Sequence, residues 1–220
     1  MLRKIFFAAL LSIAILLTGC GEEKSAPVDQ TPEFGADKAI IAYAQLYACA
    51  SPEDPKAAGF TDEFIDKQRQ AMFATFGNYP FSEQTLQAIA KNFSSTLKAR
   101  MNFKAKLKSN DATHPVIELT AQPADFSAAF KDADKDADLL ILRREWGELQ
   151  SHGLSDDAIK KDAAFQKLAV DSMSKYLGKI PLKPESTLVV TCKVAVGADG
   201  KFYWSPENPE VVSKFISGQK

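Results

Sequence analysis

The stretch LVVTCKVAVGADGKFYWS, residues 188–205, decides the fold. Its even-numbered positions from Leu188 to Val196 are apolar, and they alternate with a more mixed set of side chains, so this segment is predicted to be a strand with one buried face. The glycines and aspartate of residues 197–200 are typical of a tight turn, and residues 201–205 can then return alongside the first strand. The stretch therefore predicts a β-hairpin.

A second alternating pattern lies earlier in the chain and predicts another hairpin. Phe103, Ala105 and Leu107 are separated by lysines, and residues 116–121 repeat the alternation with Ile117 and Leu119 as the apolar side. Turn-forming residues 109–111 stand between the two segments. Lysines at every second position most often keep an exposed sheet face soluble, so we expect that role here.

Helical patterns fill the rest of the chain. One helix is expected to begin after a Thr61 cap and another after a Ser82 cap, because each side chain is followed by an apolar stripe at steps of three and four. The order is helices, hairpin, helices, hairpin and a short helix, which predicts an α+β domain with an antiparallel sheet of two hairpins covered by several helices. The expected helices span residues 36–50, 61–76, 133–150, 155–178 and 209–217, and a further one starts at Ser82 and carries its apolar stripe to Leu97.

The N-terminus has the three parts of an export signal. Arg3 and Lys4 are basic, residues 5–17 form an apolar region, and Thr18, Gly19 and Cys20 follow. The apolar run falls short of the roughly 20 residues that a helix needs to cross a bilayer core. The segment is therefore expected to be removed rather than kept as an anchor.

Leu17, Gly19 and Cys20 resemble the lipobox of bacterial lipoproteins, with Thr18 as a departure from the usual small residue. The resemblance implies that Cys20 becomes the mature N-terminus, carries a diacylglycerol thioether and fatty acyl chains such as palmitate, and holds the protein on a membrane. It also implies the outer membrane where the source has two membranes, because Gly21 and not aspartate follows the cysteine. Otherwise the outer face of the cell membrane is expected. The alternative is an ordinary secretory signal with an incidental cysteine.

The expected organisation is a signal peptide at 1–19, a lipidated tether at 20–35 and a single domain at 36–218. The tether is inferred from its charged residues and prolines and from how little it has to bury. In outline, the layout resembles small bacterial lipoproteins whose domain is cystatin-like or nuclear-transport-factor-2-like. Such a domain is a curved sheet wrapped by N-terminal helices.

Charge excludes two classes of partner. Loss of residues 1–19 removes Arg3 and Lys4 and no acid, which leaves 25 basic residues against 28 acidic ones. There is no basic excess for nucleic acid and no polybasic run for acidic lipid headgroups.

Two cysteines remain once Cys20 is assigned to lipid. Export makes a disulfide between Cys49 and Cys192 possible. Alternatively, both are small buried hydrophobic residues, since Cys49 follows an alanine-rich helix and Cys192 shares a strand face with valines.

No catalytic, metal or cofactor motif is found in the sequence. His114 and His152 lack the spacing of metal ligands, and no glycine-rich phosphate loop or nucleophile elbow occurs. The aspartates at 132, 134, 136 and 138 resemble the start of a calcium loop, but Ala137 replaces its glycine and Arg143 replaces its final glutamate. No cofactor and no metal are therefore expected.

Two classes of function follow. The first is a non-catalytic ligand-binding or protein-interaction module held on the bacterial envelope, with Tyr203 on the outward face of the last hairpin as a possible binding residue. Its partner would be an envelope protein or a small ligand. The alternative is an envelope hydrolase whose acids, such as Glu118 and Glu145, lie far apart in sequence and meet only in the fold.

Overall fold

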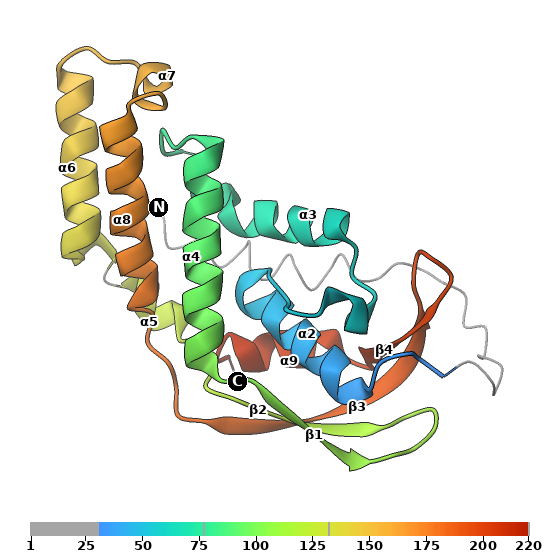
Figure 1. The fold of residues 1–220 in the computed structure, drawn as a ribbon. Coiled ribbons are helices and arrows are strands. Elements are labelled where there is room, and N and C mark those ends of the chain that lie inside the picture. Colours follow the sequence, from blue (N-terminus) through green and yellow to red (C-terminus); the bar gives the residue numbers. More distant parts are fainter. Residues whose placement is uncertain (1–30, 77, 132, 220) are drawn as a thin grey trace.

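The computed structural model describes residues 31–76, 78–131 and 133–219, so Cys20 and the predicted signal lie outside the described part of the chain. An antiparallel four-stranded sheet carries helices on one face, and further helices stand upright beside it (Figure 1). The α+β class is thereby confirmed. The strands are β1 (Lys104–Ser109), β2 (Val116–Ala121), β3 (Ser186–Val196) and β4 (Phe202–Pro206). The helices are α2 (Ala36–Cys49), α3 (Asp62–Phe73), α4 (Glu83–Met101), α5 (Phe126–Lys131), α6 (Ala137–Ser151), α7 (Asp156–Ile159), α8 (Ala163–Gly178) and α9 (Pro209–Ile216), with short 3-10 turns η1 (Pro55–Ala58), η2 (Ala74–Phe76) and η3 (Ala133–Lys135).

Strand β3 joins the two predicted hairpins into one sheet. Its first half pairs with β2, where Leu188 lies opposite Leu119, and its second half pairs with β4, where Val194 lies opposite Trp204. The strand order is β1-β2-β3-β4. The alternating pattern holds along most of β3, but Val196 at its end is exposed.

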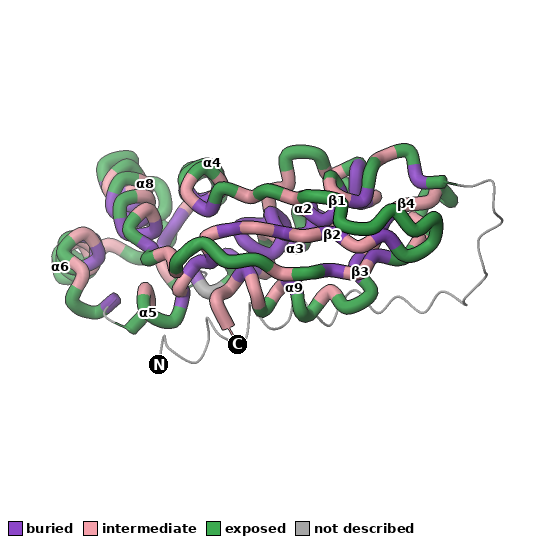
Figure 2. The backbone as a smooth tube through the Cα atoms, turned by 90° about the horizontal axis from the view of Figure 1, so that it is seen from below, coloured by how far each residue is buried: buried purple, intermediate pink, exposed green. Residues whose placement is uncertain are grey.

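Helix α2 lies against the sheet and forms the centre of the core. It contacts β1, β2 and β4 and packs beside α9, and only three of its residues escape burial. Ile117, Leu119 and Cys192 are completely buried on the sheet face beneath the helices. Figure 2 shows buried residues along the sheet and its neighbouring helices. Apolar burial on this scale is the main force that holds sheet and helices together.

The upright helices α4, α6 and α8 form the second part of the molecule. Helix α8 packs against both α4 and α6, and Arg100 of α4 donates to the backbone carbonyls of Gly178 and Ile180 where α8 ends. In both views, α6 and α8 lie at the end of the molecule opposite the residues that lead into α2 (Figures 1 and 2). No helix in the described ranges is both long enough and apolar enough to span a membrane.

Two of the predicted helices need correction. The one expected at 133–150 is divided, because Asp136 accepts hydrogen bonds from the backbone N–H groups of Asp138 and Leu139 and so starts α6 afresh. The one expected at 155–178 is also divided, since Asp162 accepts from Phe165 N and begins α8. Helix α5 was not predicted. The Thr61 and Ser82 caps are confirmed.

Candidate functional site

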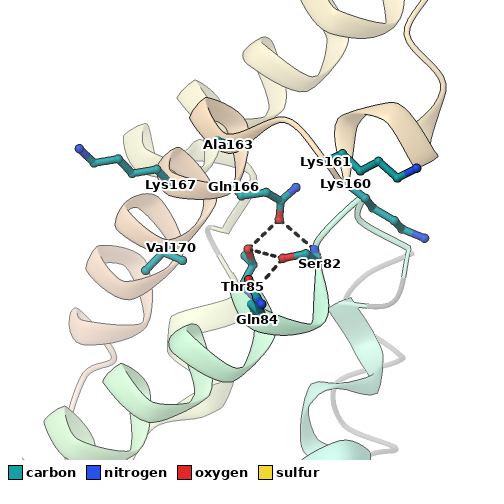
Figure 3. A pocket seen from close by; sticks show the side chains of 9 residues that line it. All are labelled: Ser82, Gln84, Thr85, Lys160, Lys161, Ala163, Gln166, Lys167 and Val170. Carbon is teal, nitrogen blue, oxygen red and sulfur yellow. Dashed lines mark hydrogen bonds between the residues drawn. The ribbon is translucent and has the colours of Figure 1, made fainter.

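A pocket of about 580 Å³ lies where the starts of α4 and α8 meet the end of α7. Three lysines line it: Lys160 and Lys161 follow α7, and Lys167 belongs to α8. Figure 3 shows Lys167 on one side of the pocket and the other two lysines on the opposite side. Ser82, Thr85 and Gln166 lie between them.

Local sequence explains why two helices begin at this place. Ser82 has an extended backbone, and its hydroxyl accepts from Thr85 N at 3.1 Å, which starts α4. Asp162 starts α8 in the same way, because its carboxylate accepts a hydrogen bond from Phe165 N at 2.8 Å. Both helices therefore present their first turns, the positive end of the helix dipole, to the pocket.

The polar floor of the pocket is a closed hydrogen-bond network. Ser82 Oγ donates to Thr85 Oγ1 at 2.9 Å, and Thr85 Oγ1 donates to Gln166 Oε1 at 2.7 Å. The same Gln166 oxygen accepts from Ser82 N at 2.8 Å. The Gln166 amide nitrogen donates to the carbonyls of Pro80 and Ile159 at 2.8 and 3.0 Å. The hydroxyl and amide hydrogens of the floor are thus used within the protein.

The lysines are the charged donors of the pocket. Lys160 lies 3.9 Å from Asp157, a carboxylate that is 88% exposed, so this contact is weak. Neither Lys161 nor Lys167 makes an ion pair within the described part of the chain. The nearest acids at the helix starts are engaged otherwise: Asp162 caps α8, and Glu83 accepts from Gln87 at 3.3 Å.

No carboxylate, thiol or imidazole belongs to the described lining of the pocket. The two hydroxyls have no adjacent base that could activate them as nucleophiles. Lysine ammonium groups and helix starts do suit a negatively charged ligand. The arrangement can therefore bind an anion, but it contains no acid–base pair.

The aspartates that resemble a calcium loop are held by basic side chains. Asp136 and Asp138 both contact Lys179 Nζ, at 3.2 and 2.5 Å, and Asp134 lies 3.1 Å from Arg143. Among the residues the structure places, no three His, Cys, Asp or Glu side chains gather as metal ligands.

Cys49 and Cys192 are both free and buried, so the possible disulfide is not formed in this structure. The Cys49 thiol donates to Gln45 O at 3.3 Å. Both cysteines pack as small apolar residues instead.

Tyr203 lies at the far hairpin, away from the lysine pocket. Its ring covers two glycines: a Cβ at Gly59 or Gly197 would lie 2.6 or 2.5 Å from ring carbons. Its hydroxyl donates to Asp199 at 2.7 Å, which raises the pKa of Tyr203. The side chain is thus held in place by the hairpin, and a role in binding stays a prediction.

The two histidines and the two acids considered for catalysis or metal binding do not come together in the fold. His114 lies in the β1–β2 turn, 3.7 Å from Glu207, while His152 follows α6 and is exposed. Glu118 pairs with Lys108 at 2.9 Å on the sheet, far in the fold from Glu145 on α6.

Sequence reasoning missed the pocket as a whole. It identified Ser82 as a helix cap but assigned no role to Lys160, Lys161, Gln166 or Lys167. The adjacent lysines before a helix start were the available signal. Nothing in the order of residues indicates that Ser82 meets a segment about 80 positions later, because that contact depends on how α4 and α8 pack.

No protein-family model and no curated protein matches the chain. Among solved structures, it is similar to the crystal structure of a putative lipoprotein (ycdA) from Bacillus subtilis subsp. subtilis str. 168. The TM-score is 0.49 and the sequence identity is 17%. The match covers 83% of this chain and 55% of that one, so the chain spans little more than half of the other protein.

Proposed function

We propose that this chain is a lipid-anchored protein of the bacterial envelope whose folded domain is a non-catalytic module that binds an anionic ligand. The observation that carries the proposal is the pocket between α4, α7 and α8, whose described lining has three lysines and no carboxylate. Lys161 and Lys167 make no ion pair in the described part of the chain, and Lys160 has only a weak contact to exposed Asp157, so these cations favour a negatively charged ligand that supplies a counter-charge.

The anchor rests on the sequence. Basic residues, a short apolar run and a lipobox-like LTGC precede a tether of about 15 residues, which can reach about 50 Å when fully extended. Lipid on Cys20 would keep the domain concentrated at the membrane surface. Replacement of Cys20 by serine should release the protein from the membrane fraction, and intact mass should show the acyl chains on the parent protein.

The pKa values give no support to the hydrolase alternative. A general acid at neutral pH needs a raised carboxyl pKa. Hydrogen bonds from Lys67, Thr113 and Tyr203 instead lower the pKa values of Glu63, Asp111 and Asp199, respectively, and all three carboxylates are exposed. These groups are therefore ordinary charged carboxylates at neutral pH.

The test is anion binding by the mature protein in a non-ionic detergent. Inorganic phosphate is titrated while the amide resonances of α4 and α8 are followed by NMR. We expect shifts at the first turns of both helices, and we expect them to vanish when the three pocket lysines become glutamine. Lys106→Gln on exposed β1 is the matched control. Equal shifts in the triple variant would refute the proposal.

A further inference from the structure

The charges of the lysine pocket are divided between two sides. Lys167 lies on one side, and Lys160 and Lys161 lie on the other (Figure 3). Between them, the donors of Ser82, Thr85 and Gln166 are consumed by internal hydrogen bonds. A ligand with a single compact charge can be neutralised on one side only. A ligand with charges at two separate points can use both sides.

We infer that the ligand of this pocket is a chain carrying at least two phosphate groups, an oligophosphate or a phosphodiester polymer, that bridges Lys167 and the pair Lys160 and Lys161. This inference rests on the proposed function, because it specifies the ligand of the same site. Binding at two linked points raises the overall affinity over either point alone.

The kinds of side chain in the lining favour phosphate over other anions. No aromatic side chain belongs to the described lining, so a sugar ring or a base has no surface on which to stack. No arginine belongs to the described lining either, so the planar fork that binds carboxylate or phosphate through two hydrogen bonds is missing, and lysine is the charged donor. Lysine acts as a point charge that suits a tetrahedral phosphate. The start of α4, which is capped by the neutral Ser82 side chain, adds the positive end of its helix dipole.

The position of the pocket favours a polymer over a lipid headgroup of the anchoring membrane. Helices α7 and α8 lie at the end of the molecule opposite the residues that enter α2, which are the ones that continue the predicted tether (Figure 1). A domain held at that end presents the pocket away from the membrane to which it is attached. The pocket is also an open recess on the surface, which a chain can cross from side to side.

The inference is tested by the dependence of affinity on chain length. Inorganic phosphate, tripolyphosphate and long-chain polyphosphate are titrated by calorimetry into the mature protein in non-ionic detergent. We expect the dissociation constant to fall about 100-fold from phosphate to the shortest chain that spans the pocket. Lys167→Gln should abolish this gain, and so should the double change Lys160→Gln with Lys161→Gln. Lys106→Gln should preserve the gain.

The outcomes separate this inference from the proposed function. Phosphate binding that is lost in the triple glutamine variant but does not strengthen with chain length would overturn the inference and leave anion binding intact. Absence of any anion binding would overturn both. Polyglutamate that binds as tightly as polyphosphate would overturn the choice of phosphate. Displacement of tripolyphosphate by phosphatidylglycerol added to the detergent micelles, but not by phosphatidylcholine added in the same way, would overturn the choice of a polymer over a headgroup.

Discussion

Gln166 joins the start of α8 to the start of α4, because its side-chain oxygen accepts the backbone N–H of Ser82 at 2.8 Å. The same oxygen accepts the Thr85 hydroxyl, and the amide nitrogen reaches the carbonyls of Pro80 and Ile159. One side chain thereby satisfies polar groups from four places in the chain. Without the Gln166 side chain, Ser82 N and Pro80 O at the start of α4 would lose their hydrogen-bond partner in a part-buried place, where water replaces it only poorly.

Gln166→Ala should therefore destabilise the domain by about 2 kcal/mol, the usual scale for leaving buried polar groups unsatisfied. For a chain of this size, the melting temperature should fall by roughly 4–8 °C. Urea unfolding followed by circular dichroism measures the change. Gln87→Ala is the control, since among the described residues the Gln87 side chain bonds to the exposed carboxylate of Glu83 alone. Equal effects of the two substitutions would show that the network at Gln166 is unimportant.

Arg100→Met should cost about 1.5–3 kcal/mol, the range for hydrogen bonds to a charged group. The Arg100 guanidinium donates to the carbonyls of Gly178 and Ile180, and a cation at a helix C-terminus is favoured by the dipole. Arg144→Met, which removes an exposed contact to Glu148 at 3.8 Å, should cost less than about 0.5 kcal/mol. Chemical denaturation of both variants gives the comparison, and a small loss at Arg100 would contradict this reading.

Local chemistry explains how much of the fold was predictable. Strand β2 and the caps at Thr61 and Ser82 were predicted because period-two alternation and capping side chains act within a few residues. The breaks before α6 and α8 were missed because Asp136 and Asp162 can stand inside a helix or cap one. Which of the two happens depends on tertiary packing.

The site was less predictable than the fold. Ser82 and Gln166 are more than 80 positions apart, and their contact arises only when α4 and α8 pack together. The Asp136 and Asp138 carboxylates illustrate the same limit, because Lys179, the cation that holds them, lies some 40 positions later. A single sequence shows the charges but not which of them meet.

Cys49 and Cys192 should resist thiol reagents in the native protein. Burial raises the pKa of Cys49 to about 11 and that of Cys192 to about 12, so almost no thiolate exists at pH 8. Iodoacetamide at pH 8 should label neither residue until urea is added, and the intact mass should not change with reductant. Native labelling would show that the thiols are accessible, and a mass gain on reduction would show that they pair.

Tyr47→Phe should leave stability at pH 7 unchanged or slightly higher, because the buried Tyr47 hydroxyl has no partner among the described groups. Burial raises the pKa of this hydroxyl above its ordinary value of 10.0. The raised pKa stabilises the fold fully below about pH 10, and this contribution is lost as pH rises through the folded-state pKa. Between pH 7 and pH 11, the free energy of unfolding of the variant should therefore fall by about 1 kcal/mol less than that of the parent, as measured by urea titration at each pH.

Tyr43→Phe is the matched comparison, since the Tyr43 hydroxyl donates to Ser205 at 3.1 Å. Burial raises the pKa of Tyr43 as well. Both variants should therefore lose less unfolding free energy than the parent as the pH rises toward 11. Only Tyr43→Phe should also lower stability at pH 7, by about 1 kcal/mol for the lost hydrogen bond. Identical values for the two variants at pH 7 would mean that Tyr47 does have a partner.

Gly59 and Tyr203 fix the approach of η1 to the last hairpin, and their contact gives the sharpest test of the β4 packing. Gly59 has φ +69°, and a Cβ there would lie 2.6 Å from the Tyr203 ring. Gly153→Ala supplies the control, because Gly153 has φ +85° and open space around it. It should show only the backbone cost of about 1–2 kcal/mol. Gly59→Ala should cost clearly more, since the ring must move as well.

Removing the Tyr203 ring tests whether its contact with a Cβ at position 59 causes the extra destabilisation of Gly59→Ala. In a double-mutant cycle measured by urea unfolding, Gly59→Ala should destabilise a Tyr203→Ala background by no more than Gly153→Ala destabilises the parent, because the close contact is gone. If Gly59→Ala were equally costly with and without the ring, the contact between η1 and β4 would not determine the hairpin position. Phosphate binding in Tyr203→Ala should match the parent, because the lysine pocket lies at the start of α8 and not at the hairpin.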